Sequence, residues 1–296
     1  MKTLISKTLL VASLLLFTFS TAYAYRPVWL LGHRCNSEEM IRLALDDGAN
    51  GVEIDVQCGS TGGSHWCVSH GVFVSEDKCD PSNWMALKVL LKKSLLLTDK
   101  RFALLYIDVK DTKYIKELVQ YVHKSCPNPP FDIVYGLNLD KMSSIPDGDI
   151  KWMADSLRER EGFCTQNDGD IKGIESKLQR LNFPITKYCY VDGKCVSTFA
   201  TWSYLRKAAQ KKFSHQLCCR TGFWTCQYAT HANGAYQDDV FCDLTMVESR
   251  GWGATSAFRW ATYYTYHNYI ANPGKYGLQL ANRETNRFWK SYKSGE

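Results

Sequence analysis

The sequence predicts an α/β fold, a single (β/α)8 barrel, from two patterns in its first half. Short apolar runs that do not alternate with polar residues are typical of strands buried on both faces. Segments with a helical period separate these runs, as expected for parallel βα units. Residues 25–296 are enough for one barrel domain, and no linker, low-complexity stretch or repeat divides them.

Four runs are expected to form strands, at residues 28–32, 51–56, 102–109 and 133–135. Residues 38–45, between the first two runs, have a helical period, and Gly48 follows a segment typical of a helix end. In a barrel, side chains at the carboxyl ends of the strands carry the chemistry. The polar residues expected at these ends are His33, Glu53, Asp55, His70, Asp108 and Lys110.

The first 24 residues have the pattern of a secretory signal peptide. Lys2 and Lys7 precede an apolar run at residues 9–19, and Ala-Tyr-Ala at residues 22–24 is a small-x-small cleavage site. The alternative is an uncleaved anchor, but the run is too short and too interrupted to span a bilayer. We expect residues 1–24 to be removed and the mature protein, residues 25–296, to be secreted and extracellular.

The charge of the chain is only mildly positive. The formal net charge is +6, and loss of Lys2 and Lys7 with the signal peptide lowers it by two, to +4. Without a long basic run, this excess predicts no nucleic-acid partner. It is compatible with an anionic membrane surface, but a solvated mixed surface explains it better. We expect the protein to be a monomer.

All 12 cysteines follow the signal peptide. An even number of cysteines in a secreted chain indicates disulfide-stapled loops, with up to six bridges. Zinc is the competing interpretation, but no Cys-x2-Cys pair has a second of its kind. Two pairs bracket short loops and are the local predictions, Cys67–Cys79 and Cys189–Cys195.

Three carboxylates at predicted strand ends indicate a metal site. Glu53 and Asp55 are two residues apart on one strand, so their side chains point to the same face. Two buried carboxylates repel each other and lose hydration, and a hard divalent cation relieves both penalties. Asp108 supplies a third carboxylate. A small number of oxygen ligands from the protein is typical of Mg2+, which keeps several of its waters. A solvated strand edge or an ion pair is the alternative.

Two histidines stand at strand ends around these carboxylates. His33 follows the first run, and His70 ends a short run at residues 66–69. A pair of imidazoles can take a proton from one oxygen and donate one to another, which phosphodiester cleavage needs. Lys110, on the same face as Asp108, can supply positive charge to phosphate oxygens. Taken alone, each histidine fits a core residue with a satisfied partner better than a catalytic one. The remaining histidines are left as structural, at positions 65, 123, 215, 231 and 267.

The motifs over residues 26–111 closely resemble those of the sphingomyelinase D-type phospholipases of spider venoms and their tick and mite relatives. The segments that carry the resemblance are residues 32–33, 48–56, 70–71 and 106–110. This family belongs to the wider glycerophosphodiester phosphodiesterase superfamily. The resemblance implies a distorted TIM barrel in which His33 and His70 are the acid–base pair. It also implies that Glu53, Asp55 and Asp108 hold Mg2+ and that Lys110 contacts phosphate.

The resemblance further implies release of the head-group alcohol from sphingolipids or lysophospholipids at a membrane surface. The neighbouring lipid hydroxyl attacks phosphorus, which leaves a cyclic phosphate and makes the enzyme a lyase. His70-Gly71 is similar to this toxin branch, and residues 67–79 correspond to its disulfide loop. His33-Arg34, by contrast, is similar to the glycerophosphodiesterases.

Beyond residue 195 the resemblance is weaker. The family has an aromatic residue and an aspartate near the seventh strand, and here Trp224 and Tyr228 are the candidate substrate contacts in that region. The aromatic tail at residues 260–269 departs from the family pattern. Its tyrosines suit either a membrane interface or packing across the barrel.

Three functions are compatible with these observations. The first is the magnesium-dependent phospholipase D-type lyase. The second is a hydrolase of small glycerophosphodiesters, favoured by Arg34. The third is a secreted lipid-binding barrel without turnover. The complete set of two histidines, three carboxylates and a lysine favours an enzyme, because a binding protein does not need all six.

Overall fold

The computed structural model describes residues 26–59, 65–69, 85–137, 142–166, 170–192, 199–214, 217–226, 243–248 and 278–290. The expected signal peptide at residues 1–24 and the aromatic segment at residues 260–269 lie outside these ranges. None of the helices in the described part of the chain has the length and apolar content needed to cross a membrane.

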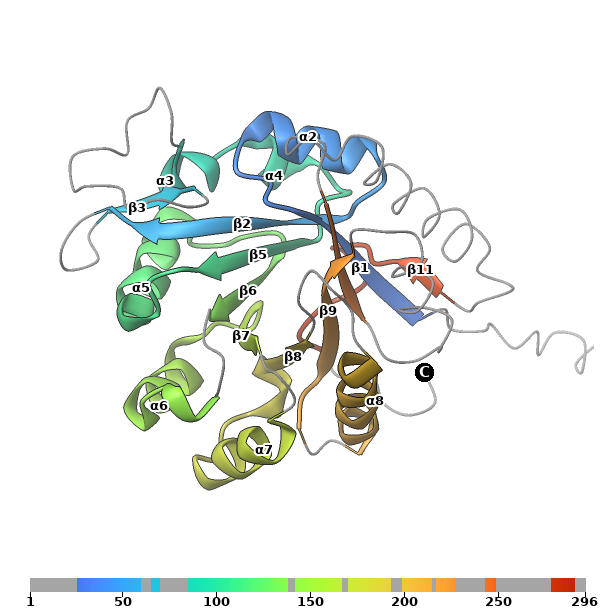
Figure 1. The fold of residues 1–296 in the computed structure, drawn as a ribbon. Coiled ribbons are helices and arrows are strands. Elements are labelled where there is room, and N and C mark those ends of the chain that lie inside the picture. The colour runs from blue at the N-terminus through green and yellow to red at the C-terminus, as the bar shows by residue number, and fades with distance from the viewer. Residues whose placement is uncertain are drawn as a thin grey trace, which may run out of the picture.

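Eight parallel strands form a closed barrel, as the sequence predicts (Figure 1). In spatial order, β1 is followed by β2 and then by β5 to β10, each hydrogen-bonded to the next. The barrel closes because β1 pairs with β10 on one side and β2 on the other. The strands are β1 (Arg26–His33), β2 (Gly51–Cys58), β5 (Leu104–Val109), β6 (Asp132–Leu137), β7 (Glu161–Gln166), β8 (Tyr188–Asp192), β9 (Arg220–Cys226) and β10 (Leu244–Glu248).

Three short strands extend the sheet beyond the barrel. β11 (Leu278–Leu280) runs parallel to the start of β1. β3 (Trp66–Val68) folds back antiparallel on the end of β2, and β4 (Met85–Ala86) pairs with β3. This small hairpin therefore stands at the carboxyl end of β2, where the sequence predicts the chemistry.

Helices surround the barrel on the outside, as Figure 1 shows for α5, α6, α7 and α8. The longer ones are α2 (Glu38–Asp46), α5 (Ile115–Ser125), α6 (Asp147–Ser156), α7 (Ile171–Arg180) and α8 (Phe199–Phe213). Shorter elements are α3 (Leu87–Leu90), α4 (Ser94–Thr98) and the 3-10 turns η1 (Thr112–Tyr114), η2 (Met142–Ser144) and η3 (Ile185–Lys187).

The predicted elements match the observed ones with small shifts at their ends. The four runs correspond to β1, β2, β5 and β6, and residues 38–45 lie in α2. The third strand starts at Leu104, because Phe102 donates its N–H to Asp99 O (3.1 Å) and still belongs to the turn after α4. Gly48 has φ 98°, a left-handed conformation that suits glycine just after a helix.

Strand alternation divides the buried residues into two layers. Val52, Ile54 and Val56 of β2 pack in the outer layer with the helices. Trp29 and Leu31 of β1 pack in the barrel interior. His33 follows Leu31 at the same parity, so the interior face of β1 ends in an imidazole.

The C-terminal residues 281–290 cover the amino-terminal end of the barrel. Phe288 donates its N–H to Asp132 Oδ2 (2.7 Å), and Trp289 Nε1 donates to Ile133 O (2.9 Å). The Phe288 ring packs edge-on against Trp29, with ring centroids 4.9 Å apart. Asp132 and Ile133 begin β6, so this packing closes the end opposite the predicted site.

The cysteines correct one prediction and limit another. Cys67 is disulfide-bonded, and its partner is not among the cysteines whose side chains are described. Cys79 lies outside the described residues, so the Cys67–Cys79 pairing stays a prediction. The Cys189–Cys195 pairing is wrong, because Cys189 is a free thiol in the barrel interior.

The upper limit of six bridges is not reached. Free thiols are present at positions 126, 164, 189, 218 and 219. These side chains are buried, and a buried thiol behaves as a small apolar group. Five of the cysteines therefore contribute to the packing of the barrel and not to a disulfide framework.

The buried carboxyl of Asp132 makes stability depend on pH. Burial raises its pKa from 3.8 to about 6. Because the folded pKa lies above the unfolded one, the stabilisation is complete below pH 3.8 and is lost as the pH rises through about 6. Asp132→Asn should remove this loss, so its unfolding free energy relative to wild type should rise by roughly 3 kcal/mol between pH 3.5 and 7.

Urea unfolding across this pH range measures the difference. The matched control is Asp155→Asn, which removes an exposed carboxylate from α6. An equal pH dependence in the two variants would contradict the effect of burial.

Candidate metal centre

Neighbouring strands bring the predicted site residues together at the carboxyl end of the barrel. Asp55 of β2 lies directly beside Asp108 of β5 in the strand register, and Glu53 lies one interior position earlier on β2. His33 is the last residue of β1. The side chains are buried, with exposures of 0% for Glu53 and 1% for Asp55, Asp108 and His33. The geometry therefore groups four of the predicted residues.

The three carboxylates are close enough to share one cation. One oxygen from each of Glu53, Asp55 and Asp108 lies within 4.8 Å of the other two. Glu53 Oε1 and Asp108 Oδ1 are buried and receive no hydrogen bond. Buried carboxylate oxygens without a donor carry a large desolvation penalty, which a bound cation offsets. The residues present therefore fit a metal ion.

Burial and mutual repulsion disfavour the ionised carboxylates when they stand alone. The pKa of Glu53 is raised well above its ordinary value, mainly by desolvation and then by the charges of Asp55 and Asp108. Desolvation likewise raises the pKa of Asp108, against the opposing attraction of Lys110. Such a cluster is stable in its charged form only beside positive charge.

Lys110 provides part of that charge. Its ammonium lies 2.7 Å from Asp55 Oδ1 and forms a second ion pair with Asp108 Oδ2. Burial lowers the pKa of Lys110, but attraction by Asp108 and Asp55 outweighs it, so the pKa is raised. The alternative that the carboxylates form ion pairs therefore holds for Asp55 and Asp108, which both pair with Lys110. Glu53 stands outside these two ion pairs.

His33 stands next to the carboxylate that Lys110 does not contact. Its Nε2 lies 3.8 Å from Glu53 Oε2. His33 therefore lies at the edge of the carboxylate cluster.

The other predicted site residues cannot be placed. His70 and Tyr228 lie outside the described residues, and Trp224 is described only as a backbone position in β9. The chain just before His70 is placed, however. Ser69 donates its N–H to Asp55 O (2.9 Å), so β3 leads the chain to the carboxylates directly before the second histidine.

Sequence reasoning missed the role of the segment between β1 and α2. Arg34 was noted only for its likeness to one family branch, and Asn36 was not considered. Arg34 N–H donates to Glu53 Oε2 (2.5 Å), and the Asn36 side chain hydrogen-bonds to Asp55 Oδ2 (2.8 Å). The only sequence signal for Arg34 and Asn36 is their position, because they follow directly after His33 at the strand end.

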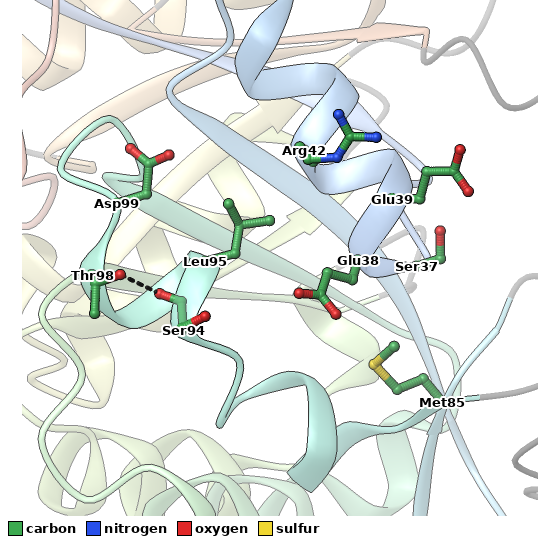
Figure 2. A pocket seen from close by; sticks show the side chains of 9 residues that line it. All are labelled: Ser37, Glu38, Glu39, Arg42, Met85, Ser94, Leu95, Thr98 and Asp99. Carbon is green, nitrogen blue, oxygen red and sulfur yellow. Dashed lines mark hydrogen bonds between the residues drawn. The ribbon is translucent and has the colours of Figure 1, made fainter.

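Two features elsewhere are separate from this centre. His123 Nε2 lies 2.7 Å from Glu161 Oε2, near the opposite end of the barrel, in keeping with a structural histidine. A pocket of about 900 Å3 lies between α2 and α4 (Figure 2). Its lining, from Ser37 at the start of α2 to Asp99 after α4, includes none of the three clustered carboxylates.

Comparisons with known proteins agree on the fold. No protein-family model and no curated protein matches the sequence. Two solved structures from Parabacteroides distasonis are similar. One, a glycerophosphoryl diester phosphodiesterase, has a TM-score of 0.53 and 12% identity over 75% of this chain and 83% of that chain. The other, a glycerophosphodiester phosphodiesterase, has a TM-score of 0.51 and 14% identity over 75% and 93%. Likeness at these identities establishes the shared TIM barrel.

Glu53→Gln distinguishes the effect of metal binding on stability from the effect of repulsion among the carboxylates. In EDTA at pH 8, the variant should be more stable than wild type, because one member of a buried repelling cluster is neutral. A divalent cation at 100 times its Kd should stabilise wild type by about 2.7 kcal/mol, and Glu53→Gln should lose most of this gain. Thermal unfolding with and without metal measures both effects.

The control for this variant is Glu161→Gln. It neutralises a buried carboxylate that pairs with His123 near the opposite end of the barrel. It should keep the full metal-induced gain. Equal gains in Glu53→Gln and wild type would show that Glu53 holds no metal.

Lys110→Met tests whether the ammonium opposes cation binding. Removing a positive charge that lies on Asp55 and Asp108 should tighten divalent metal binding by roughly tenfold, or about 1.4 kcal/mol. Isothermal titration calorimetry measures the change, with Lys113→Met, an exposed lysine of η1, as the control. Weaker metal binding by Lys110→Met would mean that Lys110 supports the ion and does not compete with it.

Proposed function

We propose that this protein is a secreted, Mg2+-dependent phosphodiesterase. One observation carries the proposal, namely the buried cluster of Glu53, Asp55 and Asp108 with His33 and Lys110 at its edge. Buried acidic groups beside a histidine at the carboxyl ends of barrel strands are typical of an active site. A lipid-binding protein has no use for carboxylates held close together at such an energetic penalty.

The three carboxylates would hold the cation, which when bound supplies Lewis-acid stabilisation to the phosphate oxygens. Lys110 is close enough to share the carboxylates and, on its flexible side chain, can turn to a non-bridging phosphate oxygen. Positive charge on these oxygens stabilises the charge that develops in the transition state. Lys110 therefore has two roles, as counter-ion of Asp55 and Asp108 and as phosphate contact.

We assign acid–base catalysis to His33 and His70. One imidazole takes the proton of the attacking oxygen, which forms the new P–O bond. The other protonates the departing alcohol oxygen as the old P–O bond breaks. His33 is held beside Glu53, and Ser69 brings the chain that carries His70 to Asp55. Trp224 and Tyr228 remain the proposed substrate contacts across the site.

Hydrolysis of glycerophosphodiesters is the reaction we favour. Arg34 follows the first histidine as in the glycerophosphodiesterases, and both similar solved structures are of phosphodiesterases that act on glycerophosphodiesters. Water then attacks phosphorus, and the products are glycerol phosphate and the head-group alcohol.

A phospholipase D-type lyase is the second candidate. His70-Gly71 is similar to the toxin branch, and Cys67 is disulfide-bonded as in the loop of that branch. In that reaction a neighbouring hydroxyl of a sphingolipid or lysophospholipid attacks phosphorus and forms a cyclic phosphate. The substrate would be met at a membrane surface by a monomeric extracellular enzyme.

One assay distinguishes these functions. Purified protein is given glycerophosphocholine, lysophosphatidylcholine and sphingomyelin, each with Mg2+ or EDTA, and the products are identified by phosphorus NMR. Glycerol phosphate indicates the hydrolase, and a cyclic phosphate indicates the lyase. Folded protein that forms neither product from any of the three would refute the proposed activity.

His33→Asn should lower turnover by about 10²- to 10⁴-fold, the usual contribution of a general acid or base. Because the carboxylates are intact, metal-induced stabilisation should persist in this variant. The control is His123→Asn, which removes a histidine at the other end of the barrel and should keep turnover. Loss of turnover only in proportion to unfolding would make His33 a core residue.

A further inference from the structure

The edge of β2 that faces β1 loses its strand partner before it reaches the metal-centre carboxylates. The β1–β2 register covers only Leu31 with Gly51 and Gly32 with Val52. β3 takes over this edge from Val56 onward. Between these two ladders, the backbone groups of Glu53 and Asp55 need other partners, since buried backbone groups are almost always hydrogen-bonded.

The segment between β1 and α2 supplies these partners. Cys35 N–H donates to Glu53 O (2.8 Å), as a continuing strand would. At the next position, Asn36 Oδ1 accepts the N–H of Asp55 (2.9 Å). The side-chain amide of Asn36 thus takes the place of a backbone peptide and completes the edge of β2.

The same segment also orients the two carboxylates of β2. Asn36 Nδ2 donates to Asp55 Oδ2 (2.8 Å), so a single amide bonds both the backbone and the side chain of Asp55. Arg34 N–H bonds Glu53 Oε2, which leaves Glu53 Oε1 without a donor. Each hydrogen bond occupies one carboxylate oxygen and directs the other toward the cluster.

The position of Asn36 is itself fixed on both sides. Arg34 has φ 55°, a left-handed conformation that costs a non-glycine residue about 1 kcal/mol and turns its N–H toward Glu53. After Asn36, Ser37 caps α2 by accepting the N–H of Met40 (3.2 Å). The strained turn and the helix cap hold the amide in a single place against Asp55.

We propose that Asn36 is a positioning residue for the metal centre. It acts through Asp55, by fixing the rotamer that presents Oδ1 to the cation. Only an amide provides an acceptor for the Asp55 N–H and a donor for its carboxylate in one rigid plane. The inference rests on the metal site of the proposed function, and it adds a residue that contacts neither metal nor substrate.

The expected effect is a loss of metal affinity without a comparable loss of folding. Hydrogen-bond partners behind metal ligands typically contribute 10- to 100-fold to affinity. Asn36→Ala should therefore weaken metal binding by about that factor, while the melting temperature in EDTA stays within a few degrees of wild type. Asn36 is half-buried, so water can reach the Asp55 N–H in this variant.

Manganese is the probe, because Mn2+ prefers the same oxygen ligands and its unbound fraction is measured directly by electron paramagnetic resonance. Wild type, Asn36→Ala and Asn282→Ala are titrated, and Mg2+ is then added as competitor. Asn282 offers a matched control, since its amide oxygen also accepts a backbone N–H, from Glu284 (2.7 Å), at the opposite end of the barrel. It should bind Mn2+ as wild type does.

Equal Mn2+ affinity in Asn36→Ala and wild type would overturn the inference while leaving the proposed function intact. Failure of wild type to bind Mn2+ would overturn the metal site and the inference together. If Asn36→Ala does not fold, Asn36→Leu keeps the side-chain volume and removes both hydrogen bonds. Unfolding of both variants in EDTA would show a structural role instead of a positioning one.

Discussion

Repulsion among three buried carboxylates is the constraint on which the rest of this structure depends. Glu53, Asp55 and Asp108 stand within reach of one cation, almost without solvent. Left alone, they would protonate or unfold the end of the barrel. Lys110 neutralises part of the charge, and the orphaned oxygens of Glu53 and Asp108 indicate where a cation supplies the rest.

The barrel keeps this cluster at one end by closing the other. The C-terminal residues pack under the strands, where Phe288 and Trp289 hydrogen-bond to the start of β6. Apolar side chains then fill the interior up to Leu31 of β1. The clustered carboxylates lie at the other end, at the carboxyl ends of β2 and β5, beside the short β3–β4 hairpin.

Two neighbouring segments supply the hydrogen bonds around the cluster. The turn after β1 orients Glu53 and Asp55, whereas β3 bonds the backbone of Asp55 from the other side. A site whose ligands are held by the scaffold loses little entropy when it binds a cation. The same rigidity explains why a strained residue, Arg34, is tolerated at this turn.

The sequence alone determined four of the eight barrel strands and the face on which Glu53 and Asp55 lie. Alternation along a strand is a local property, so it needs no knowledge of neighbours. It also placed His33 at a strand end, although His70 and Tyr228 lie outside what the structure describes.

Tertiary structure decided the rest, because partners are set by strand register and by the path of the turns. The register placed Asp108 beside Asp55, where Lys110 bridges both, and it put the free thiol of Cys189 inside the barrel. It also left a gap in the edge of β2 that Asn36 fills. The contacts of Asp55 with Asp108, Lys110 and Asn36 have no sequence spacing that signals them, since each joins segments that meet only in the folded barrel.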